Sequence, residues 1–155
     1  MMDRTTLARG TELEAEVTAL TFEGRGVAHV GGMAVFMRGA LPGDVVRVRL
    51  TKVKASYAEG EAVAIVQPSP WRVAARCRHY GLCGGCVMQD LAYQQQLEHK
   101  ASQVADVLIH MGGLQVEVLP PLGMEQPWHY RNKMEFTFGT SDEGPYVGLM
   151  QRGSY

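Results

Sequence analysis

Hydrophobic and polar residues alternate along the first part of the chain. Leu13, Ala15 and Val17 alternate with Glu14 and Glu16, as the residues of a half-buried β-strand do. The same period continues between turns that contain glycine, and it predicts strands at 13–19, 27–30, 33–37, 46–50 and 61–66. Five short strands without a helical stretch predict a small closed or nearly closed barrel over 1–67, of the five-stranded oligonucleotide-binding type.

The pattern changes after the prolines Pro68 and Pro70, which predict an extended linker. Further on, Asp90 is the expected N-cap of an amphipathic helix that ends at Gly112-Gly113, after about five turns. Apolar residues recur along it every three or four positions, and this stripe is expected to be core: Leu97, Ala101, Val104, Leu108 and Met111.

The last part of the chain predicts a single hairpin. Apolar residues alternate over 134–138, a turn is expected at 141–144, and a partner strand over 146–150. Two strands and a helix bury little apolar surface, so the residues after Gly113 are expected to be poorly packed. The fold is therefore predicted to be mainly β with an α+β second part, in three regions: 1–67, 68–89 and 90–155.

All three cysteines lie in the middle region, 68–89, at C-x5-C-x2-C spacing: Cys77, Cys83 and Cys86. Clustered thiols in a reducing compartment more often ligate metal than form disulfides. An iron–sulfur cluster usually takes four thiolates, so one ligand would come from elsewhere, whereas a zinc site of the Cys3His type could use His79. Three buried free thiols are the plainer alternative. Arg72, Arg76 and Arg78 lie nearby in sequence and would stabilise an anionic cluster.

Composition narrows the class of protein. Of the 155 residues, 46% are hydrophobic and 20% are charged, as in a globular protein, and no apolar run approaches the roughly 20 residues that span a bilayer. The start of the chain lacks a secretory pattern, so a cytoplasmic location without membrane contact is expected. Net charge is −1, with eight basic and eight acidic residues in 1–66, so nucleic-acid binding must rest on local clusters.

Two such clusters stand out. Basic and aromatic residues of the predicted barrel would contact phosphates and stack on bases: Arg25, Phe36, Arg38, Arg47, Arg49, Lys52, Lys54 and Tyr57. The alternative is an ordinary solvated strand face that Glu59 and Glu61 neutralise. The second cluster, 128–133, interleaves Trp128, His129 and Tyr130 with Arg131 and Lys133, which fits base stacking or a packed strand entry.

Several ordered motifs resemble the N-terminal part of the RNA uracil-5-methyltransferases that carry a TRAM domain and a [4Fe-4S] cluster, the 23S ribosomal RNA enzymes above all. The motifs are Gly24-Arg25-Gly26, Gly39-Ala40-Leu41-Pro42-Gly43-Asp44, Cys77, Cys83-Gly84-Gly85-Cys86 with Gln89, Tyr130-Arg131-Asn132-Lys133 and Gly148-Leu149-Met150-Gln151-Arg152-Gly153-Ser154. The resemblance implies a TRAM barrel, an iron–sulfur loop and the start of a central RNA-binding domain over 90–155.

The resemblance also implies a reaction. A cysteine thiolate adds to C6 of uracil, C5 takes the methyl group of S-adenosylmethionine, and a base removes the C5 proton. The nucleophile, the base and the methyl-donor site are expected outside these residues, as is a fourth cluster ligand, so this chain alone is expected to be inactive. The implied partner is 23S ribosomal RNA, with no DNA, and a monomer is expected. Two other functions are an RNA-binding module with a zinc site and an iron–sulfur redox or sensor protein.

Overall fold

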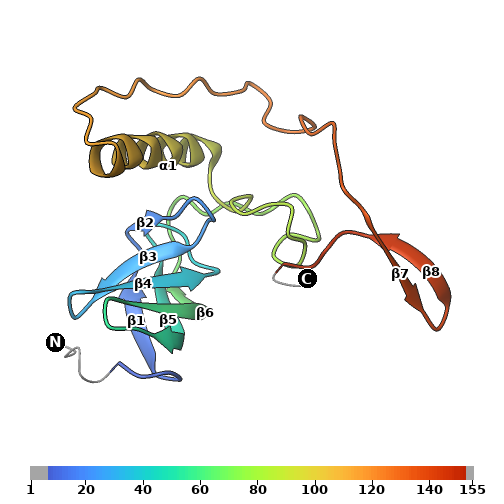
Figure 1. Ribbon diagram of the computed structural model, residues 1–155, viewed down its shortest axis with the longest axis horizontal. Coiled ribbons are helices and arrows are strands. Elements are labelled where there is room, and N and C mark those ends of the chain that lie inside the picture. The colour runs from blue at the N-terminus through green and yellow to red at the C-terminus, as the bar shows by residue number, and fades with distance from the viewer. Residues whose placement is uncertain (1–6, 153–155) are drawn as a thin grey trace.

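The structure, a computed structural model, describes residues 7–152 (Figure 1). A curled sheet forms the first part of the chain. An irregular segment over 68–92 follows it, which we call the cysteine segment. One helix and one separate hairpin make up the rest of the described chain. The fold is therefore mainly β with one helix, as the alternating pattern predicted.

The sheet has six strands in the order β1-β5-β6-β4-β3-β2. Neighbouring strands are antiparallel, except that β4 and β6 are parallel. Their bounds are β1 (Glu12–Glu16), β2 (Ala19–Leu20), β3 (Gly26–Val30), β4 (Met33–Arg38), β5 (Val45–Val53) and β6 (Tyr57–Gln67). Strand β6 is longer than the alternation over 61–66 predicted, because Tyr57 pairs with β4 and Ala58 to Gly60 pair with both β4 and β5.

The sheet curls because one short run of chain, 12–20, forms the strands at both edges of the sheet. Strand β1 pairs with β5, and β2, which follows after only Val17 and Thr18, pairs with β3. Val17 donates its backbone N–H to Asp44 O at 2.9 Å, and Thr18 donates to Val27 O at 2.8 Å. The single strand expected over 13–19 is therefore two strands, and the change of partner occurs at these two residues.

Alternation along each strand points every second side chain into the curled sheet. The interior is apolar and closely packed, with fully buried Val35, Met37, Val46, Val48 and Ala58. Where β5 pairs with β6, a Cβ on Gly60 would lie 2.6 Å from Val48 Cγ2, so only glycine fits there.

The segment after β6 is packed against the sheet and is not the extended linker that its prolines predicted. Ser69 is buried, and its backbone N–H donates to Asp44 Oδ1 at 2.8 Å. Arg72 lies three residues further on and donates from Nε and Nη2 to both oxygens of the same carboxylate, at 2.8 and 2.7 Å. Because Asp44 is fully buried, these bonds fix where the cysteine segment leaves the sheet.

The helix α1 (Tyr93–Asp106) continues into a π-helical turn, η2 (Val107–Met111), and ends at Gly112 and Gly113 as predicted. Its N-cap is Ala92 and not Asp90, whose carboxylate is occupied by Arg72 and Tyr80 instead.

The helix docks through amide side chains and not through its apolar stripe. Gln96 donates to Met88 O and Leu91 O, and Gln103 donates to Leu20 O at 2.9 Å. No residue of α1 or η2 is buried, and Met111 is 82% exposed. The expectation that the stripe is core is therefore wrong for the described chain.

The hairpin of β7 (Thr137–Ser141) and β8 (Gly144–Gly148) lies apart from the sheet (Figure 1). It begins three residues later than the alternation over 134–138 predicted. Phe138 is 83% exposed, and Leu122 in the preceding irregular segment is fully exposed. The region after Gly113 is thus poorly packed, as expected for a helix and one hairpin that bury little apolar surface. Among residues 7–152 no helix is both long enough and apolar enough to cross a bilayer.

Candidate nucleic-acid interface

The structure gathers most of the predicted barrel residues on one outward surface, which we call the β4–β6 face. Val35, Met37 and Ala58 point inward, so strand alternation places their neighbours on β4 and β6 outside. Lys52 and Arg25 join this face through their ion pairs with Glu59. The face consists of Arg25, Phe36, Arg38, Lys52, Tyr57, Glu59 and Glu61.

Two aromatic rings lie at the centre of the β4–β6 face. Phe36 and Tyr57 pack edge to face, with ring centroids 5.9 Å apart and planes at 71°. Lys52 Nζ lies 5.8 Å from the centroid of the Tyr57 ring, a cation–π distance. Both rings are half-buried, so part of each stays available to a stacking base.

A carboxylate, Glu59, lies among the cations of this face. Lys52 Nζ donates to Glu59 Oε1 at 3.0 Å, and Arg25 Nη1 lies 3.7 Å from Oε2. The hydrogen bond from Lys52 lowers the pKa of Glu59. Loss of hydration opposes this shift, and the positive charges of the nearby cations reinforce it. The same bond raises the pKa of Lys52. Both groups are therefore charged near neutral pH. Arg25 also pairs with Glu23 at 3.1 Å.

Three other predicted cations of the barrel lie elsewhere. Arg47 pairs with Glu14 at 3.3 Å and Arg49 with Glu12 at 2.7 Å, so the β1–β5 surface is an ordinary neutralised strand face. Lys54 is exposed in the turn between β5 and β6. On the β4–β6 face, Glu59 pairs with Lys52 and Arg25, so both alternatives that the sequence left open stay open there.

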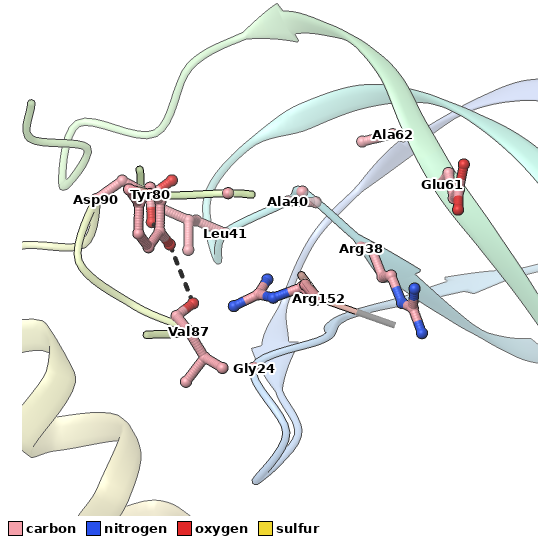
Figure 2. A pocket seen from close by; sticks show the side chains of 12 residues that line it. Gly24, Arg38, Ala40, Leu41, Glu61, Ala62, Tyr80, Val87, Asp90 and Arg152 are labelled. Atoms are coloured by element: carbon pink, nitrogen blue, oxygen red, sulfur yellow. Dashed lines mark hydrogen bonds between the residues drawn. The ribbon is translucent and has the colours of Figure 1, made fainter. Parts of the chain in front are cut away.

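A cleft of about 330 Å³ lies between this face and the cysteine segment (Figure 2). Arg38 and Glu61 line it from the sheet, and Tyr80, Asp90 and Arg152 line it from the other side. Gly24 at the edge of the cleft abuts Val87, whose Cβ would be 2.8 Å from a Cβ on that glycine. The cleft is mixed in charge, with arginines and carboxylates on its walls.

Arg72 ties the cysteine segment to the sheet behind this cleft. Besides Asp44, it donates from Nη1 to Asp90 Oδ2 at 2.8 Å. Tyr80 in turn donates to Asp90 Oδ1, and burial, followed by that hydrogen bond, raises the pKa of Tyr80. Tyr80 therefore stays a neutral donor. Arg72 therefore bonds two carboxylates, and its stabilisation of an anionic cluster stays a prediction.

The three cysteines are not drawn together into one site. Cys77 and Cys86 are exposed and Cys83 is half-buried. Within residues 7–152, no three histidine, cysteine or acidic side chains are grouped so that they could hold a metal ion. Gln89 bridges the segment instead, accepting from the Cys77 backbone N–H at 2.8 Å and donating to Cys86 Sγ at 3.6 Å. The donor types fit an iron–sulfur cluster, whereas their arrangement does not.

The zinc alternative is also not preformed. Arg78 Nε donates to His79 Nε2 at 3.0 Å, so this ring nitrogen already accepts a hydrogen bond. The guanidinium of Arg76 stacks on Trp128 at 4.6 Å from the ring centroid, and its stabilisation of an anionic cluster likewise stays a prediction.

The second basic cluster lies against the cysteine segment and not on the β4–β6 face. Arg131 Nη1 lies 4.0 Å from the position of a Cβ on Gly85, while Lys133 pairs with Glu135 on an exposed stretch. Arg152 reaches the same segment, donating its backbone N–H to Leu82 O at 2.8 Å and its guanidinium to Cys86 O. Sequence reasoning had assigned Arg152 no individual contact, because its neighbours are fixed only by the fold.

Comparison with known proteins matches the curled sheet to a known domain family. Residues 7–63 match the TRAM domain family. The chain is 41% identical over 137 residues to an uncharacterized RNA methyltransferase of Bacillus cereus, covering 88% of this chain and 30% of that protein. It is 41% identical over 144 residues to the 23S rRNA (uracil(1939)-C(5))-methyltransferase of Nitrosococcus oceani, covering 91% and 32%.

Among solved structures, a Pyrococcus abyssi tRNA (uracil-54, C5)-methyltransferase in complex with S-adenosyl-L-homocysteine matches 68% of this chain and 23% of its own, at 30% identity and a TM-score of 0.40. The curated relatives define the class, a TRAM-containing chain related to RNA methyltransferases. More narrowly, the chain is similar over most of its length to 23S rRNA uracil-C5 methyltransferases, the resemblance that its motifs predicted. It spans about a third of the length of the curated relatives it matches.

Proposed function

We propose that this chain is an RNA-binding segment of a methyltransferase that makes 5-methyluridine in 23S ribosomal RNA with S-adenosylmethionine as methyl donor. The observation that carries the proposal is 37–46% identity, over most of the chain, to proteins named for that reaction. S-adenosylmethionine would supply the methyl group, and we assign no residue of this chain to it. The 155-residue chain alone is expected to transfer no methyl group.

In this proposal the sheet is an OB-like TRAM barrel, and RNA lies on the β4–β6 face. Phe36 and Tyr57 offer ring surface for a base, and Lys52, Arg25 and Arg38 lie within the same patch. Aromatic rings flanked by cations are the usual means by which such barrels hold single strands. Lys54, Arg131 and Lys133 lie away from this patch and are proposed as secondary contacts to phosphate. We also propose a cytoplasmic monomer that does not bind DNA.

RNA binding by the full 155-residue chain tests the proposal. A single-stranded, uridine-containing RNA of about 12 nucleotides with a fluorescent end label suits a surface of this size. Phe36→Leu removes a stacking ring and keeps an apolar side chain, so affinity should fall about tenfold. Phe138→Leu makes the same change on the exposed hairpin and should leave affinity unchanged. Equal losses in both variants would contradict the assignment of the face.

The iron–sulfur cluster remains a separate proposal, supported by the family resemblance and by the three thiols of one short segment. We expect anaerobically purified protein to be brown and to contain iron and sulfide, with Cys83→Ser losing both. Because the thiols are not preassembled, binding would require the cysteine segment to rearrange. Colourless protein with one zinc per chain, lost in His79→Ala, would support the Cys3His alternative and contradict the cluster.

A further inference from the structure

Glu59 carries a negative charge on a surface that is proposed to bind a polyanion, which it would repel. Its carboxylate lies in the middle of the β4–β6 face, directly beside Phe36 in the parallel register of β4 and β6. Its side chain is only 29% exposed, and it contacts the two cations that a phosphate would otherwise use, Lys52 and Arg25. A solvated acid at the rim would be ordinary, but this one occupies the centre.

The surroundings of Glu59 hold its two cations in place. Lys52 lies over the Tyr57 ring, which Phe36 buttresses edge to face, and Arg25 is also held by Glu23. Two oxygens that receive a lysine ammonium and an arginine guanidinium reproduce the way a phosphodiester is bound by proteins. Exposed ion pairs of this kind are weak in water, so an incoming phosphate could replace the carboxylate.

We propose that Lys52 and Arg25 form a phosphate subsite for single-stranded RNA, which the Glu59 carboxylate occupies until RNA displaces it. This inference rests on the proposed RNA-binding function and adds a named subsite and a built-in competitor to it. The displaced carboxylate remains a negative charge beside the bound phosphate, and it offsets part of the neutralisation that the two cations provide. Glu59 therefore lowers both the affinity for RNA and its dependence on salt.

Glu59→Gln tests the inference directly. Removing the competitor should strengthen binding of the labelled uridine-containing RNA several-fold. The slope of log affinity against log salt should steepen by about 0.7, the value for one phosphate of a single strand. Glu14→Gln is the matched control, because it removes the same charge from the ion pair with Arg47 on the β1–β5 surface. It should leave the slope unchanged.

A second background separates a local subsite from a general loss of negative charge. In Lys52→Gln protein, the gain from Glu59→Gln should largely disappear, because one of the two cations that the carboxylate blocks is no longer present. Circular dichroism and thermal unfolding confirm that each variant is folded.

Two results would overturn the inference. If wild-type protein binds RNA and Glu59→Gln behaves like Glu14→Gln, the subsite is refuted and the proposed function survives. If neither wild type nor Glu59→Gln binds RNA, the proposed function fails and the subsite with it.

Discussion

Asp44 is a fully buried carboxylate with four hydrogen-bond donors around it. Besides Ser69 and Arg72, the backbone N–H of Leu41 donates to its Oδ2 at 2.7 Å. Arg72 is itself only 19% exposed and carries the connection onward to Asp90. A buried charge is tolerated only when it is paired and hydrogen-bonded in this way, so removing the charge should be costly.

We therefore expect Asp44→Asn to lower the free energy of unfolding by about 3 kcal/mol, since it leaves the guanidinium of Arg72 short of a charged partner. Urea denaturation followed by circular dichroism measures the change. Glu14→Gln, which breaks an exposed pair, should cost less than about 1 kcal/mol. A similar, small effect for both variants would mean that the Asp44–Arg72 pair does not stabilise the sheet.

His99 gives the stability a dependence on pH. Its Nε2 atom is buried without a hydrogen-bond partner among the described residues, and burial lowers its pKa, against the opposing charge of Glu98. As pH falls below the ordinary histidine pKa of about 6.5, the unfolded chain takes up the proton first. Stability is therefore full above that value and declines as pH falls toward the lowered pKa.

His99→Leu removes this titration. Urea unfolding at about pH 7.5 and about pH 5.5, on either side of the ordinary histidine pKa, should show a smaller loss for the variant than for wild type. Identical losses would show that His99 is equally protonated in the folded and the unfolded protein.

At the scale of elements, the alternating pattern predicted the strands of the sheet and missed what depends on pairing. The break at Val17 and Thr18 follows from the competition of β5 and β3 for one run of chain, which no local period encodes. The register that sets Lys52 opposite Glu59 likewise depends on a bulge in β5. The sequence could therefore nominate Phe36, Lys52 and Glu59, but not the register that brings Lys52 and Glu59 together.

The helix shows why an apolar stripe alone does not identify the packed side. Its period predicted the helix and its glycine stop, but the side that docks carries Gln96 and Gln103. Both amides donate to backbone carbonyls of the chain outside the helix. The stripe with Val104 and Met111 stays outside. The rule that amphipathic helices bury their apolar side assumes a core to bury it in, and the described chain offers none there.

At the scale of the whole molecule, the curled sheet and the cysteine segment are joined through buried polar contacts, and the side chains proposed to bind RNA lie on the sheet. The join runs from Asp44 through Arg72 to Asp90 and Tyr80, and the cleft opens beside it. The spacing of the three cysteines indicated a metal site, but it did not show that the described segment keeps their thiols apart.

The measurement closest to the central claim is the salt-dependent binding of single-stranded, uridine-containing RNA to the full chain, by fluorescence anisotropy. The account predicts saturable binding that weakens as salt rises and that depends on Phe36 but not on Phe138. Absence of binding at low salt, or binding that Phe36→Leu leaves intact, would contradict an RNA-binding β4–β6 face.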